Sequence, residues 1–251
     1  RPEVVSDYLC AFGITEVSKL GVITAADGKL QVVGYTAGAS LILSAPTAAG
    51  TFEFGRNAHV SISMDMSDTN KRHIFINGLD ANPTYLTYAN NTFGMDAWDT
   101  MYAGAGPNTS NGWQGELGEF YFDDVYTDLA TDNPFWDADL GRPNSVRKVI
   151  DDTGVTPLVA LPIIGTDAGN NLGSGGDFTV NSGPYTGARG GSEFSARSAW
   201  TGLTASSPTL TNYLSNAGLT GASSSTTALT IIMAVKSRDA TLDNNKFQHP
   251  R

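Results

Sequence analysis

Two glutamates, Glu116 and Glu119, are the residue types best suited to acid–base chemistry, and they lie in a segment predicted to be a strand. Retaining glycoside hydrolysis needs two carboxyl groups about 5 Å apart that face one cleft. In this segment Leu117, Phe120 and Phe122 do not keep the every-second-residue spacing of one strand face. A bulge at Gly118 and Glu119 would bring all three to the same face, and glycine suits a bulge. We interpret both acids as solvent-facing side chains on the outside of a sheet, and we predict no catalytic residues.

Oxygen-bearing side chains suggest a cation site in the loop of a predicted hairpin, at Asp65, Asp68 and Asn70. Ca²⁺ takes six to eight oxygen ligands, so these residues are calcium candidates. Asp and Asn are also ordinary turn residues, and that interpretation stays open. A second set with the same two interpretations is Asp167, Asn170, Asn171 and Asp177. We predict no other cofactor.

The remaining metal and nucleophile candidates are few. His59 and His73 flank the same hairpin loop, but two histidines without a cysteine make a poor zinc site. Cys10 is the only cysteine, so no internal disulfide forms, and no histidine lies near it in the sequence. Nucleophilic catalysis therefore has little support.

The long loops of residues 90–114 carry aromatic rings and an amide that suit sugar binding, because C–H surfaces stack on rings. The candidate glycan ligands are Trp98, Tyr102, Asn108 and Trp113. The alternative is that these aromatic residues anchor the loops or belong to the core.

The elements that position these residues are predicted to be short strands joined by tight turns. The chain has 28 glycines, 11 prolines and only 16% charged residues, which is typical of a β-rich protein. The predicted strands are Leu20–Thr24, Leu30–Tyr35, Ser40–Ser44, Phe52–Phe54, His59–Met64, Arg72–Asn77, Glu116–Tyr126, Pro157–Ile164, Phe178–Val180 and Ala228–Lys236. Asn77-Gly78 predicts a turn. Asp132-Asn133-Pro134 predicts a short helix carrying Phe135, Trp136 and Leu140.

Charge and hydropathy exclude two kinds of partner. The formal net charge is −10, and acidic residues follow the only basic cluster, Arg142–Lys148. Such a surface repels the nucleic-acid backbone, so we predict no nucleic-acid binding. No run of about 18 apolar residues occurs, so we predict no membrane insertion.

The order of these signals resembles the concanavalin A-like jelly roll, in the laminin-G-like form of bacteriophage virion proteins. The strand and turn motifs that carry the resemblance are His59–Asp65, Ile74–Gly78, Gly115–Asp123, Asp128-Leu129, Pro157–Leu161 and Asn171–Val180. The resemblance covers roughly residues 20–180 and implies an all-β, two-sheet antiparallel sandwich with short helical turns. Hydrolases of this fold carry E-x-D-x-x-E, whereas Glu116-Leu117-Gly118-Glu119 lacks the middle acid and is shorter.

Such domains usually open with a strand pair that residues 1–20 lack and that Tyr213–Lys236 resembles. We therefore divide the chain into a jelly-roll domain at 1–185, a Gly/Ser/Ala-rich linker at 186–204 and further strands at 205–251. These last strands either open a second jelly roll in a longer tandem protein, or complete the first sandwich within the chain or between chains.

The resemblance implies a non-enzymatic structural protein on the surface of a phage particle: a capsid decoration, tail or fibre component. Its expected partners are other virion proteins or further copies of itself. The alternative is an extracellular carbohydrate-binding adhesin that recognises a host glycan through loops 90–114.

Overall fold

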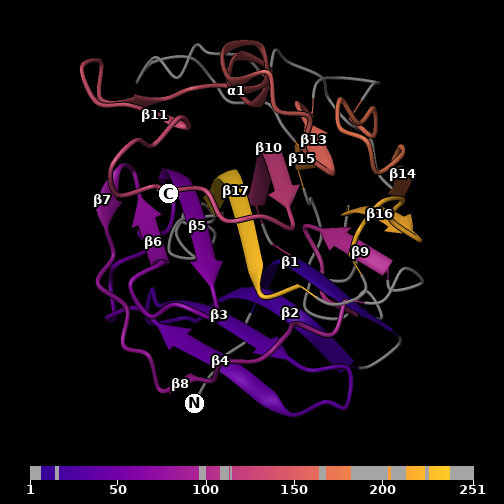
Figure 1. Cartoon of the computed structure of the whole chain (residues 1–251). Helices are drawn as coiled ribbons and strands as arrows, with labels where there is room; N and C mark the ends of the chain where they lie inside the picture. Colours follow the sequence, from indigo (N-terminus) through magenta and orange to yellow (C-terminus); the bar gives the residue numbers. More distant parts are fainter. Residues whose placement is uncertain are drawn as a thin grey trace, which may run out of the picture.

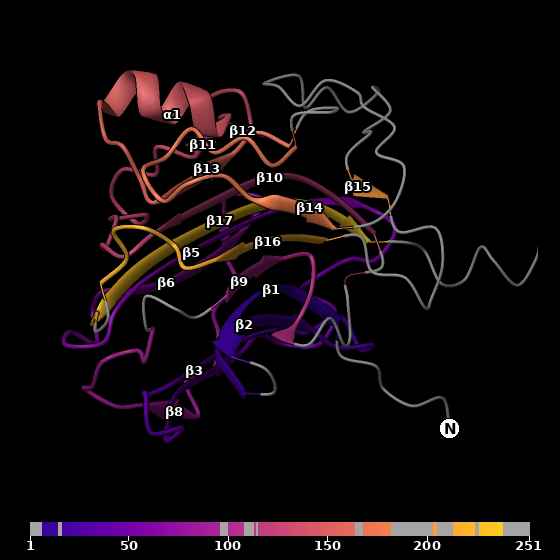
Figure 2. The ribbon, with the colours of Figure 1, turned by 90° about the vertical axis from the view of Figure 1, so that its right-hand side faces the viewer.

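The computed structural model describes residues 7–14, 17–95, 100–107, 113, 115–163, 168–181, 203–204, 213–223 and 226–237. These residues form two antiparallel sheets packed face to face, with one short helix outside them (Figures 1 and 2). The predicted all-β sandwich is confirmed.

The first sheet begins with a strand that the sequence did not predict, β1 (Asp7–Ile14). The predicted strands Leu20–Thr24, Leu30–Tyr35 and Ser40–Ser44 follow it along the chain as β2, β3 and β4. In spatial order the sheet contains β14 (Thr179–Asn181), β16 (Tyr213–Ala217), β9 (Thr100–Ala103), β1, β2 (Val17–Thr24), β3 (Leu30–Tyr35), β4 (Leu41–Pro46) and β8 (Thr87–Tyr88). Phe52–Phe54 is not a strand as predicted, because the chain turns there while Phe52 is buried in the core.

The second sheet contains β13 (Val159–Leu161), β10 (Gly115–Asp123), β17 (Ala228–Ser237), β5 (Asn57–Asp65), β6 (Arg72–Ile76) and β7 (Leu79–Asp80). A two-residue strand, β15 (Leu203–Thr204), also pairs with the start of β10. The strand β13 has a proline near each end and lies at one edge of this sheet, where a missing N–H donor is tolerated.

Two local predictions on the second sheet are confirmed. Asn77 and Gly78 join β6 to β7 and both have positive φ, 52° and 74°, as a two-residue hairpin turn with an Asn-Gly sequence requires. The register of β10 against β17 shifts between Leu117 and Glu119, which is the expected bulge. The bulge places Leu117, with Phe120 and Phe122 beyond it, in the core between the sheets.

The C-terminal strands lie inside the sandwich. β17 pairs with β5 on one side and with β10 on the other, and β16 pairs with β14 and β9 in the first sheet. In this structure they therefore complete the sheets that residues 7–181 leave open. The existence of a second domain in a longer protein stays a prediction.

A third layer covers the outer face of the second sheet (Figure 2). This covering layer, residues 129–153, contains a small hairpin, β11 (Trp136–Asp137) with β12 (Arg142–Pro143), and the helix α1 (Val146–Thr153). The predicted helix at Asp132–Pro134 was wrong. The Asn133 Oδ1 atom accepts the N–H of Phe135 in a turn, and the helix begins later, where the Ser145 side chain accepts the Lys148 N–H.

Candidate functional site

Glu119 lies on the outer face of the second sheet, beneath the covering layer, rather than in solvent as predicted. Its Oε2 atom accepts the N–H of Val146, the first residue of α1, at 3.2 Å. Burial raises the pKa of this carboxyl to about 8, and the hydrogen bond from Val146 lowers it in part. Glu119 therefore fixes the start of α1 to the sheet. The side chain of Glu116 lies outside the described residues.

His59 is buried on the same outer face. Its ring lies 5.8 Å from the ring of Trp136, and Nδ1 lies 3.3 Å from Ser61 Oγ. Burial lowers the pKa of His59 to about 3, so the imidazole is neutral at physiological pH. In the sheet register His59 pairs with Ala234, and Ala234 pairs with Glu119.

His73 is not brought next to His59. It pairs with Ser63, four residues along β5 from His59, which is about 13 Å. Its Nε2 atom lies 3.1 Å from the hydroxyl of Tyr126. The two histidines therefore lie apart along the hairpin.

The calcium candidates Asp65 and Asp68 hold the β5–β6 loop. Asp65 Oδ1 accepts the Ser67 N–H and hydroxyl, and Asp68 Oδ1 accepts the Asn70 N–H. These hydrogen bonds are typical of Asp in turns, which was the second interpretation of these residues from the sequence. Over the residues placed in the structure, no three His, Cys, Asp or Glu side chains group closely enough to hold a metal ion. Calcium binding stays a prediction.

In the second set of calcium candidates, Asn171 and Asp177 make hydrogen bonds within their own loop and to β13. Asn171 Oδ1 accepts the N–H groups of Ala160 and Gly173, and Nδ2 donates to the carbonyls of Leu158 and Gly176. These four hydrogen bonds use the whole amide to tie the loop to β13. Asp177 accepts the Asn171 N–H, and Asp167 lies outside the described residues.

Two of the four glycan candidates of loops 90–114, Tyr102 and Trp113, belong to the described residues. Trp113 is only 3% exposed and packs edge-on against Phe52 in the core, with ring centroids 5.9 Å apart. Tyr102 is half-buried on β9, and its ring lies 5.9 Å from that of Tyr213. Trp98 and Asn108 lie outside the described residues. Trp113 is thus the core residue that the sequence left as the alternative.

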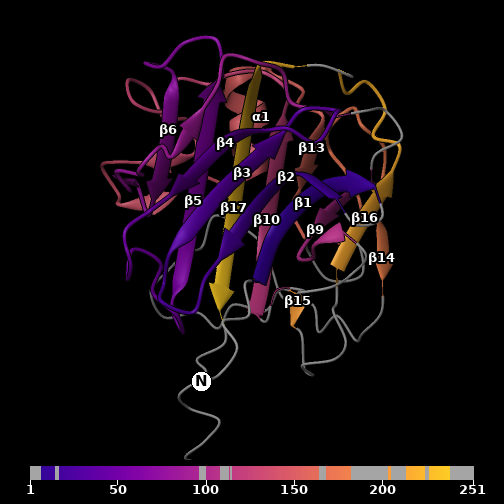
Figure 3. The ribbon, with the colours of Figure 1, turned by 90° about the horizontal axis from the view of Figure 1, so that it is seen from below.

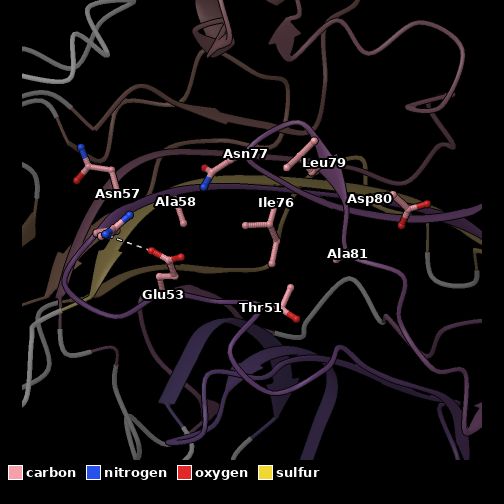
Figure 4. A pocket seen from close by; sticks show the side chains of 10 residues that line it. Thr51, Glu53, Asn57, Ala58, Ile76, Asn77, Leu79, Asp80 and Ala81 are labelled. Atoms are coloured by element: carbon pink, nitrogen blue, oxygen red, sulfur yellow. Dashed lines mark ion pairs between the residues drawn. The ribbon is translucent and has the colours of Figure 1, made fainter.

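Sequence reasoning missed an open pocket of about 460 Å³ beside the β6–β7 edge of the second sheet (Figure 4). The Asn77-Gly78 turn was its only sequence signal. The pocket lies between this edge and the loop that precedes β5, and Ile76 and Ala58 point toward that loop. Its lining residues are Thr51, Glu53, Arg56, Asn57, Ala58, Ile76, Asn77, Leu79, Asp80 and Ala81.

Hydrogen-bond donors and hydrogen-bond acceptors both line this pocket. Glu53 and Arg56 form an exposed ion pair with Nε and Oε2 3.0 Å apart. Asn77 Oδ1 accepts the His59 N–H at 2.9 Å, which fixes the orientation of the amide and leaves its NH₂ group as a donor. Asp80 is an exposed acceptor, and Leu79, 74% exposed, supplies an apolar surface next to it. The pocket combines donors, acceptors and an apolar strip.

Comparison of the chain with models of known families, with curated proteins and with solved structures finds no match. In the part of the chain described above, no helix has the length and apolar character to cross a membrane. A proposal on function therefore depends on the sequence resemblance and on the geometry of these residues.

Proposed function

We propose that this chain is a non-enzymatic structural module of a bacteriophage virion that acts through protein–protein contacts, as a capsid decoration, tail or fibre component. The virion role comes from the sequence resemblance to laminin-G-like phage domains. The structure supports the non-enzymatic part through one observation: Glu119 is beneath the covering layer and bonded to the start of α1. A carboxyl that accepts the first N–H of a helix in this way makes a structural contact.

The packing of the second sheet also supports a structural role. Its inner face packs on the first sheet, and Tyr121 and Ile232 on its outer face pack against Phe135 and Val149 of the covering layer. Elements with so many buried contacts open only with the global free energy of unfolding, which suits a rigid particle component.

The test is the composition of purified particles of a phage that encodes this chain. We expect quantitative mass spectrometry to find the chain at a fixed ratio to the major capsid protein across a density gradient and after a high-salt wash. Recovery only in the soluble lysate fraction would overturn the virion role. Release of reducing ends from polysaccharides, abolished in Glu119→Gln, would overturn the non-enzymatic part.

A second candidate function is saccharide binding, and the pocket beside β7 favours it. A volume of about 460 Å³ lies within the range of small-molecule sites, about 300–1,000 Å³. Sugar hydroxyls both donate and accept, which matches the carboxylates, the guanidinium and the Asn77 amide. The C–H face of a sugar would lie against Leu79.

Glycan-array screening followed by calorimetry tests this second candidate. We expect Glu53→Ala and Asp80→Ala each to weaken saccharide binding at least about tenfold, which is about 1.4 kcal/mol. Asp152→Ala is the matched control, because Asp152 is also the exposed acid of an ion pair but lies on α1. No binding by the unaltered chain, or equal loss in all three variants, would reject the pocket as a glycan site.

A further inference from the structure

The last strand of the described chain is the central strand of the second sheet. β17 runs between β5 and β10 (Figure 3) and pairs from Ala228 opposite Asp65 to Lys236 opposite Asn57. On its other side it pairs with β10 from Gly115 to Asp123. Without β17, β5 and β10 would each present an unpaired edge in the middle of the sheet. We call the space between them the β17 slot.

Burial shows how fully β17 depends on this slot. Leu229, Ile231, Met233 and Val235 are 0% exposed in the core between the sheets. On the opposite face Ile232 packs under the covering layer, and the Thr230 hydroxyl donates to the Val125 carbonyl at 2.8 Å. The strand is thus apolar and enclosed on both faces, as a central strand must be.

The same segment also adds a strand to the first sheet. β16 lies between β14 and β9, with Leu214 opposite both Val180 and Ala103. Strand pairing and core packing join β15, β16 and β17 to the body of the sandwich, and side-chain hydrogen bonds add to them, such as that from Asn216 Nδ2 to the Gly175 carbonyl. The three strands β15, β16 and β17 are consecutive along the chain and insert into both sheets.

The connection to these three strands is long compared with the molecule. Residues 182–202, a stretch of 21, separate β14 from β15. Fully extended, such a stretch spans about 70 Å. A compact domain of this size has a radius of gyration of about 18 Å. The connection is therefore long enough to carry these strands to the β17 slot of a neighbouring molecule.

We propose that residues 203–237 exchange between two copies of this chain, so that β17 of one copy fills the β17 slot of the other. The partner is a second copy, and every pairing of the closed molecule is kept in the exchanged dimer. This self-association goes beyond the proposed virion role and does not depend on it.

Concentration decides which form is populated. A tethered segment competes with other copies at an effective concentration on the order of a millimolar. The closed monomer is favoured in dilute solution, and exchange becomes favourable where copies are crowded to about that level. Exchange requires the central strand to leave the core, so dimers formed at high concentration persist after dilution.

Interchain crosslinking of the full chain tests the exchange. In a Cys10→Ala background, one copy carries Asp65→Cys and the other carries Ala228→Cys. These residues are cross-strand partners, whose Cβ atoms lie about 4.5–5.5 Å apart, near the range that a disulfide spans. The two copies are unfolded, mixed, refolded at about 10 µM or about 1 mM and oxidised. We expect the crosslinked dimer to increase at least about tenfold at the higher concentration.

The matched control splits Ile23→Cys and Gln31→Cys between two copies. These residues also pair, but both belong to the β2–β3 hairpin, which does not exchange. Crosslinking no greater than in this control, at either concentration, would overturn the proposal. The unaltered chain gives a second measurement that needs no cysteine pair. Light scattering should find a dimer after refolding at about 1 mM and a monomer after refolding at about 10 µM, whereas monomer alone in both samples would also overturn it.

Discussion

Ile231 of β17 pairs directly with Ile62 of β5, and neither side chain is exposed to solvent. The two residues come from opposite parts of the chain and meet at the centre of the sandwich core. The stability of the whole fold therefore depends on a strand close to the C-terminal end of the sequence.

Replacing Ile231 by alanine should show this dependence. The change removes buried methyl groups from a core that cannot collapse fully around the cavity, and we expect a loss of about 2–5 kcal/mol in the free energy of unfolding. Leu79→Ala, at an exposed edge position, should change it by less than about 0.5 kcal/mol. Urea titration followed by fluorescence gives both values. Similar effects of the two changes would contradict the central position of β17.

Glu119 predicts a stability that falls as pH rises. Its pKa is raised from 4.5 to about 8 in the folded state, so between these values the folded chain keeps a proton that the unfolded chain releases. Ionisation therefore destabilises the fold as pH increases through this window. Glu119→Gln keeps a neutral acceptor for Val146, and it should be more stable than the unaltered chain by about 2–4 kcal/mol at pH 8.5, but nearly equal at pH 4.5.

Thermal unfolding of the two proteins across this pH range measures the difference. Glu119 is only half-buried as a whole residue, and solvent reduces the cost of its ionisation. We therefore expect a gain near the lower end, about 2 kcal/mol. Parallel stability curves for the two proteins would show that the carboxyl is ionised normally and is not enclosed by the covering layer.

His59 predicts the opposite slope. Its pKa is lowered from 6.5 to about 3 in the folded state, so below pH 6.5 the unfolded chain binds a proton that the folded chain does not. Stability is then lost as pH falls from 6.5 toward 3. Relative to the unaltered chain, His59→Gln should gain about 2 kcal/mol between pH 6.5 and pH 5. Denaturant titrations at these two pH values provide the measurement, and an unchanged difference would show that His59 is accessible to protons.

The strand pattern of the sequence predicted much of the second sheet, because alternation and turn residues act locally. Val60 and Ile62 alternate inward, Asn77-Gly78 turns the chain, and Gly118 permits the bulge. Neither the neighbour of each strand nor the placement of β17 in the middle follows from local pattern, since pairing between distant segments depends on the whole core. Sequence alone left that choice open between one chain, two domains and two copies.

The candidate sites were harder to predict because the same residue types serve turns and cores. Asp65 and Asp68 are oxygen ligands by type but accept backbone N–H groups in the loop. Glu119 looked solvent-facing because nothing in the strand indicates that residues 129–153 cover its outer face. The pocket combines a loop near Glu53 with a turn near Asn77, and only the fold brings these together.

Trp113 provides a prediction that separates a core role from a ligand-binding role. Because it is buried against Phe52, Trp113→Ala should lower the free energy of unfolding by about 3–5 kcal/mol. Thermal unfolding measures the loss. When only folded protein is compared, this variant and the unaltered chain should bind glycan with the same affinity. An unchanged stability would show that Trp113 lies at the surface and restore it as a ligand candidate.

The central position of β17 is tested most directly by hydrogen exchange of its backbone amides, measured by NMR or mass spectrometry. The amides of Thr230–Ala234 should exchange as slowly as those of Val60–Met64 in β5, at the rate set by global unfolding, because both segments lie inside the same sheet. Fast exchange in Thr230–Ala234 beside slow exchange in Val60–Met64 would contradict the account, since it would place the last strand outside the sandwich.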